Sequence, residues 1–128
     1  MITENILVPF YRPSSDLKAL YHSFALAERI RAKIFVLFFK DAHTFPDQNS
    51  PIEEACLKII RDACEEGIPV SFHMAGGQLK TELSSFVKAE HIGLIVISPG
   101  DETMESILRD MKPEIRAQVI KVQKKINH

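Results

Sequence analysis

The sequence lacks any long apolar run, and neither sign of charge is in excess. No stretch approaches the roughly 20 consecutive apolar residues that span a bilayer. The 16 basic and 17 acidic residues give a formal net charge of -1, which is not the electrostatic footprint of a nucleic-acid or membrane-surface protein. The chain also begins without the pattern of a signal peptide. We therefore expect a cytoplasmic protein that binds neither nucleic acid nor membranes.

Cysteine is scarce, and its placement argues against disulfide and metal chemistry. Cys56 and Cys64 lie eight residues apart in what reads as one helix. At roughly 1.5 Å per residue that is about 12 Å along the axis, too far for an internal disulfide. The five histidines show no ligand spacing with each other or with the cysteines. We expect two small buried cysteines and no metal site.

Catalytic patterns are missing as well. The serines stand outside any nucleophile-elbow context, and no pair of carboxylates has surroundings that would tune one as an acid and the other as a base. The sequence therefore predicts no catalytic residue, and we expect a protein that is not an enzyme.

The chain does contain a regular alternation of apolar runs and amphipathic stretches. Its 128 residues, 45% of them hydrophobic, are enough for one domain, residues 1–128, with a sizeable core. Strand and helix alternating with short connections imply an α/β fold in which a parallel sheet carries helices on both faces. The predicted strands are 5–10, 32–39, 68–74 and 93–98, and the predicted helices follow residue 16, follow residue 50 and cover 78–90 and 102–111.

The C-terminal segment 117–123 is ambiguous. Val119, Ile120 and Val122 favour a short fifth strand. Pro113 complicates this, because it would either kink the last helix or start a separate C-terminal helix. The segment is therefore expected to be a strand, with a helix as the alternative.

The apolar run from Gly93 to Ser98 is typical of a parallel strand buried on both faces. In open parallel sheets, ligands bind in the crevice beyond the carboxyl ends of the strands. The loop that follows contains Gly100, Asp101 and Glu102, whereas a phosphate-binding loop offers several glycines and exposed amide donors. The sequence predicts a nucleotide-type fold whose nucleotide site is altered.

The order and spacing of these elements resemble the universal stress protein family over nearly the whole chain. The residues that carry the resemblance are the opening strand Asn5 to Pro9, the entry to the third strand from Glu66 to Val70, and the fourth strand Leu94 to Ile97. The resemblance implies a three-layer sandwich with a five-stranded parallel sheet in the order 3-2-1-4-5. It also implies a homodimer made by pairing the last strand of each subunit.

The nucleotide-binding members of that family carry an aspartate after the first strand and a glycine-rich loop after the fourth. Carried over without a gap, the aspartate falls on Tyr11 and the first two loop glycines fall on Ser98 and Asp101. The third glycine and the hydroxyl residue that follows it fall on Met111 and Lys112. This chain therefore resembles a divergent member without the glycine-rich ATP loop.

Charge points the same way as the missing glycines. Asp101 and Glu102 would stand beside a triphosphate, and each like-charge pair near 4 Å costs about 1 to 4 kcal/mol. A magnesium ion bridging carboxylate and phosphate would offset that cost, and both carboxylates are equally at home as caps of the last helix. We expect no cofactor bound in the family's usual way. The candidate ligand residues at the ends of the first and fourth strands are Phe10, Tyr11, Phe39, Ser98, Gly100 and Asp101.

Two functions remain open at this point. The first is a universal-stress-protein-like regulatory or stress-response module that acts by dimerisation or by binding a protein partner. An exposed apolar edge strand is a hazard that proteins normally cover, so Val119, Ile120 and Val122 are the candidate interface residues. The alternative is a protein that binds AMP, ATP or another small molecule in the crevice at the ends of strands 1 and 4.

Overall fold

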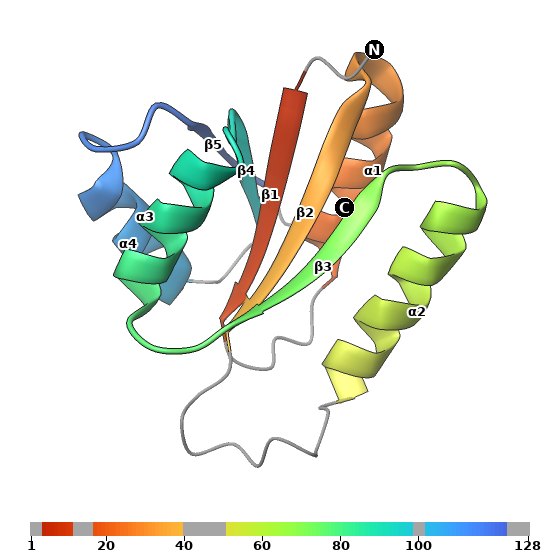
Figure 1. Cartoon of the computed structure of the whole chain (residues 1–128), viewed down its shortest axis with the longest axis horizontal. Coiled ribbons are helices and arrows are strands. Elements are labelled where there is room, and N and C mark those ends of the chain that lie inside the picture. Colours follow the sequence, from red (N-terminus) through yellow and green to blue (C-terminus); the bar gives the residue numbers. More distant parts are fainter. Residues whose placement is uncertain (1–3, 12–16, 40–50, 99–101, 123–128) are drawn as a thin grey trace, which may run out of the picture.

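A computed structural model describes residues 4–11, 17–39, 51–98 and 102–122. Four helices lie between five strands that form one sheet in the order β3-β2-β1-β4-β5, and every neighbouring pair is parallel. The predicted fold and strand order are therefore confirmed. In chain order the elements are β1 (Glu4–Tyr11), α1 (Lys18–Ile30), β2 (Ala32–Phe39), α2 (Pro51–Glu65), β3 (Val70–Ala75), α3 (Leu79–Ala89), β4 (Leu94–Ile97), α4 (Glu102–Met111) and β5 (Gln118–Lys121) (Figure 1).

The sheet separates two apolar cores. Because successive side chains of a strand point to opposite faces, Ile6 and Val8 of β1 lie in one core and Leu7 lies in the other. The first core contains buried residues of α1 and α2, and the second contains buried residues of α3 and α4. Figure 1 shows α1 and α2 on one side of the sheet and α3 and α4 on the other. The molecule is thus a three-layer sandwich.

The C-terminal segment forms the fifth strand, so the strand prediction is confirmed over the helical alternative. Gln118 begins β5 by donating its N–H to the Gly93 carbonyl at 2.9 Å. Val122 lies one residue beyond β5 and donates its N–H to the Ile97 carbonyl at 3.0 Å. Pro113 lies after the end of α4, where it interrupts no helix.

Two local expectations need correction. The third strand begins at Val70 and not at residue 68. Pro69 has no N–H to give to a ladder, although its carbonyl accepts from the Ile34 N–H at 2.9 Å. Cys56 is buried as expected, but Cys64 is exposed, and its Sγ donates to the Val70 carbonyl at 3.5 Å.

The amino end of β1 is tied firmly to its neighbours. The Gly93 N–H donates to the Asn5 carbonyl at 3.1 Å, and the Asn5 side chain donates from Nδ2 to the Glu90 carbonyl at 2.7 Å. That second bond satisfies a carbonyl at the C-terminus of α3, which the helix itself leaves without a partner. The Glu4 carboxylate packs against Gly93, so a β-carbon at that position would require the carboxylate to move. Among the helices of the described ranges, none is long and apolar enough to cross a membrane.

Candidate functional site

The strand order places a topological switch point between β1 and β4. The chain moves outward from β1 to β2 and β3, then returns to the other side of β1 for β4 and β5. In sheets of this kind, the crevice at the carboxyl ends of the two strands beside the switch point is the usual ligand site. Of the candidate ligand residues from the sequence, Phe10, Phe39 and Ser98 lie at this end of the sheet, as does the backbone of Tyr11.

The two ladders of β1 differ sharply in length at this end. The β1–β2 register extends along the whole strand to the pair Tyr11 and Phe39. The β1–β4 register consists of Ile6 with Leu94 and Leu7 with Ile95, and it stops there. The two strands beside the switch point are therefore paired at their amino ends only.

Pro9 explains where the β1–β4 ladder stops. The Asn5 carbonyl faces β4, and backbone groups alternate sides along a strand, so the nitrogen of Pro9 faces β4 as well. The Ile97 carbonyl accepts the N–H of Val122, just beyond β5, so the same alternation directs the Val96 carbonyl toward β1. If the register continued, the Val96 carbonyl would stand opposite the Pro9 nitrogen. Proline has no N–H to donate, and the next rung is lost.

The two phenylalanines among the candidate ligand residues are packed in the cores. Phe10 is 3% exposed and its ring stacks on Phe38 at a centroid distance of 4.9 Å, on the α1 and α2 side of the sheet. Phe39 is 6% exposed and belongs to the core beneath α3 and α4. The two rings therefore lie on opposite faces of the sheet, and each contributes to a core that supports this end.

The other candidate ligand residues are described only in part. Ser98 follows β4 directly and is buried. The backbone of Tyr11 pairs with Phe39, while its side chain lies outside the described part of the structure, as do Gly100 and Asp101. The structure thus brings Tyr11, Phe39 and the end of β4 to the same end of the sheet.

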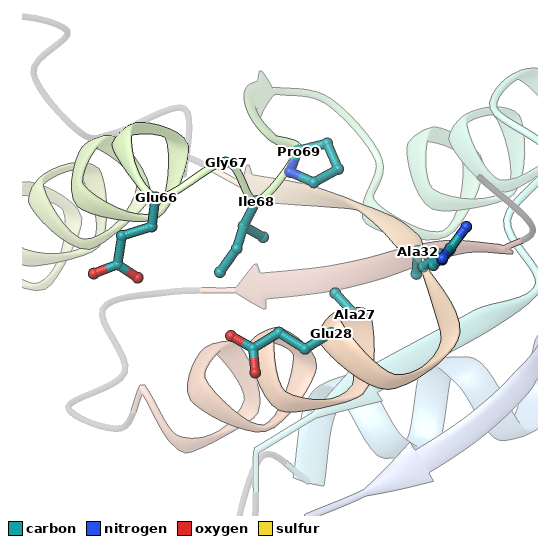
Figure 2. Close-up of a pocket in the computed structure, with 8 residues that line it drawn as sticks. Ala27, Glu28, Ala32, Glu66, Gly67, Ile68 and Pro69 are labelled. Carbon is teal, nitrogen blue, oxygen red and sulfur yellow. The ribbon is translucent and has the colours of Figure 1, made fainter. Parts of the chain in front are cut away.

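Nothing in the sequence drew attention to a pocket at the opposite end of the sheet. It has a volume of about 360 Å³ and lies where α1 and α2 end and β2 and β3 begin. Figure 2 shows Ile68 pointing toward Ala27, while the carboxylates of Glu28 and Glu66 extend to the same side of the pocket. Arg31, in the left-handed conformation with φ 53° at the end of α1, also lines it. A sequence pattern does not reveal the shape of a pocket formed by helix ends.

The structure also shows a serine–histidine pair that the sequence pattern did not single out. Ser71 Oγ and His73 Nε2 are 2.9 Å apart on one face of β3. The imidazole ring contacts the rings of Phe35 and Phe86, at centroid distances of 5.8 Å and 5.1 Å, and these two rings also contact each other. An activated serine needs a base that a third group orients, and within the described ranges no carboxylate hydrogen-bonds this histidine. Residues two apart on a strand share a face, which is the signal that would have paired them.

Metal ligands are not grouped in the part of the chain that the structure describes. Residues 4–11, 17–39, 51–98 and 102–122 contain no cluster of three or more His, Cys, Asp or Glu side chains with the spacing of a metal site.

The candidate interface residues lie along the outer strand β5. Val119 is half-buried and packs on the core beneath α3 and α4, whereas Ile120 and Val122 pack on the opposite core. In the described structure β4 is the only strand that pairs with β5. One edge of β5 therefore carries backbone donors and acceptors that no other described strand uses.

Comparison with known proteins identifies this architecture. No family model matches the chain, and no curated protein sequence matches it. Among solved structures, a universal stress protein from Archaeoglobus fulgidus matches with a TM-score of 0.67 at 19% identity, covering 96% of each chain. A universal stress protein family member from Burkholderia pseudomallei matches with a TM-score of 0.65 at 17% identity, covering 93% of this chain and 95% of that one.

A family member from Arabidopsis thaliana, solved with AMP bound, gives a TM-score of 0.59 at 16% identity and covers 96% of this chain and 93% of that one. The likeness covers at least 93% of this chain in each of the three structures, at identities of 16 to 19%. The chain has the fold of the universal stress proteins.

Proposed function

We propose that this protein is a universal-stress-protein-like regulatory module that acts through its β5 edge, by forming a homodimer or by binding a protein partner, and not by catalysis. The observation that carries the proposal is the outer edge of β5, which no other described strand pairs with, beside the half-buried side chains of Val119, Ile120 and Val122. Such an edge is a template for pairing with another strand.

The chemistry of β5 supports self-pairing. In an antiparallel pair centred between Val119 and Ile120, each Lys121 would stand opposite a Gln118 of the second copy. Like charges directly opposite each other destabilise a sheet, and this register avoids them. Lys121 is moreover neutralised within its own chain, because its Nζ lies 3.1 Å from Glu105 Oε2.

The oligomeric state of Ile120→Lys tests this proposal. A charge at the centre of a paired edge, desolvated against a second copy, is expected to convert a dimer into a monomer in light scattering or sedimentation. Met74→Lys is the matched control, because Met74 lies on the opposite edge strand β3 and is 44% exposed. A wild-type dimer that survives Ile120→Lys, or that Met74→Lys disrupts equally, would contradict a β5 interface.

A second candidate function is binding of an adenine nucleotide at the carboxyl ends of β1 and β4. It is favoured by the early end of the β1–β4 ladder at Leu7 and Ile95, which leaves the crevice at the switch point unclosed by backbone pairing. It is also favoured by similar structures that were solved with ligands, one from Archaeoglobus fulgidus in complex with dAMP and the Arabidopsis protein with AMP. AMP suits this site better than ATP, since Asp101 and Glu102 would repel a triphosphate.

Calorimetric titration with AMP and ATP, each with and without magnesium, separates the two functions. Nucleotide binding predicts saturable heat with AMP and its loss in Tyr11→Ala, with Tyr21→Ala as the control because Tyr21 lies on the exposed face of α1. The absence of heat from every titration, together with a dimer that depends on Ile120, would leave the interface as the function.

A further inference from the structure

A groove between β5 and α4 lies beside the proposed β5 interface and contains none of the candidate nucleotide residues. It has a volume of about 460 Å³, within the range of pockets that take small organic ligands. All its lining residues belong to the described part of this one chain, from α4, β5, the end of β4 and the turn before β5. The groove arises because α4 does not cover the outermost strand completely.

The base of the groove is apolar. Ile97 and Leu108 are each 1% exposed, Ala117 is 7% exposed, and Val119 is half-buried. All four also belong to, or pack against, the core beneath α3 and α4. An apolar chain or ring laid against them would leave water and contact a rigid surface, which is the main source of affinity in small-molecule sites.

The rim of the groove is cationic. Arg109, Lys112 and Lys121 line it, and Glu105 is the single carboxylate among the lining residues. Glu105 is already engaged, 3.1 Å from Lys121 Nζ and 3.7 Å from Arg109 Nη2. Lys112, one helical turn beyond Leu108, has no ion-pair partner among the described residues. The rim therefore has positive charge that the protein itself leaves uncompensated.

The pocket at the amino ends of β2 and β3 has the opposite charge character. Two carboxylates, Glu28 and Glu66, and one cation, Arg31, line the hollow at the amino ends of β2 and β3. A negatively charged ligand is therefore expected to bind the groove between β5 and α4 in preference to the pocket that Glu28 and Glu66 line, because like charges repel.

We propose that the groove between β5 and α4 binds a small amphipathic organic anion, with its apolar part on Leu108 and Val119 and its carboxylate beside Lys112 and Arg109. A medium-chain carboxylate has this chemistry. The site is built within the single chain and uses none of the candidate nucleotide residues, although it shares Ile97 with the end of β4 and Val119 with the proposed β5 interface.

Calorimetry of the full chain with decanoate, below its micelle concentration, tests the proposal. We expect saturable binding of one decanoate per chain, weakened about threefold in Arg109→Gln, as for the loss of one exposed ion pair, and about tenfold in Lys112→Glu, where the charge is reversed. Arg31→Gln is the matched control in the other pocket and should leave the affinity unchanged. Decylammonium, which has the same chain and the opposite charge, should not bind.

Several outcomes would overturn the proposal: no saturable heat, equal binding of decylammonium, or equal weakening by Arg31→Gln. The same titration on Ile120→Lys separates this inference from the proposed dimer, since residue 120 does not line the groove. Decanoate must still bind to that variant, whatever its oligomeric state. Circular dichroism of each variant establishes that weakened binding reflects the groove and not loss of the fold.

Discussion

The two ends of β1 differ in how many neighbouring strands their backbones pair with. At the amino end, Asn5 receives the Gly93 N–H and donates to the Glu90 carbonyl, so strand, loop and helix are joined by hydrogen bonds. At the carboxyl end, Pro9 ends the ladder to β4 while the ladder to β2 continues to Tyr11. β1 is thus joined to both neighbouring strands at its amino end and to β2 alone at its carboxyl end.

The difference teaches that the two-rung β1–β4 ladder leaves the carboxyl end of β1 without backbone pairing to β4. Side chains are buried toward both ends of β1, since Leu7 is fully buried and Phe10 is 3% exposed. What distinguishes the ends is therefore backbone pairing and not apolar burial. Substitutions in side-chain packing, side-chain hydrogen bonding and backbone pairing are expected to have successively smaller effects on stability.

Leu7→Ala should have the largest effect. Leu7 is 0% exposed and is the last β1 residue paired with β4, so truncation leaves a cavity and costs about 2 to 5 kcal/mol of unfolding free energy. The measurement is the urea midpoint at an unchanged slope. Leu17→Ala is the control, because Leu17 is half-buried before α1 and should lose less than half as much. Equal losses of unfolding free energy would mean that the core around Leu7 is packed no more tightly than the surroundings of Leu17.

Asn5→Ala should have an intermediate effect. It removes the 2.7 Å bond from Nδ2 to the Glu90 carbonyl and leaves that acceptor without its partner, which costs about 1 to 2 kcal/mol. A lowering of the thermal midpoint by roughly 4 to 8 °C is expected for a chain of this size. Asn5→Asp sharpens the test, because a carboxylate cannot donate to a carbonyl and would repel it. If Asn5→Asp is as stable as the parent protein, the side chain does not anchor α3.

The fold could be predicted from the sequence because the apolar runs follow one another in the order of the strands and helices. The buried strand from Leu94 to Ile97 and the fifth strand around Val119 were both placed correctly. The exposure of Cys64 was missed, since the helical spacing of two cysteines does not say which one faces the sheet. The start of β3 was also misplaced, because Ile68 reads as strand although Pro69 delays the ladder.

The candidate sites were less accessible to sequence reasoning. Phe10 and Phe39 lie at the expected end of the sheet, but the alternation of strand side chains sends their rings into opposite cores. The groove between β5 and α4 depends on how far a helix lies from a strand, which no local pattern encodes. Lys112 and Lys121 are close in the sequence to many other charged residues, and only the fold selects those that share a rim with Arg109.

Pro9→Ala should change stability least and test the comparison most directly. The alanine restores an N–H that faces the Val96 carbonyl, a gain of about 0.5 to 1.5 kcal/mol, while the loss of proline makes the unfolded chain more flexible and costs about 0.4 to 1 kcal/mol. The two contributions to stability nearly cancel, so the informative measurement is hydrogen exchange of the new amide.

If Pro9 alone ends the β1–β4 ladder, that amide should be protected about as well as the amide of Leu7. Exchange as fast as at an exposed site would show that the strands are held apart by something other than a missing donor. Protection of the new amide accompanied by weaker AMP binding would tie the open end of β1 to the nucleotide crevice.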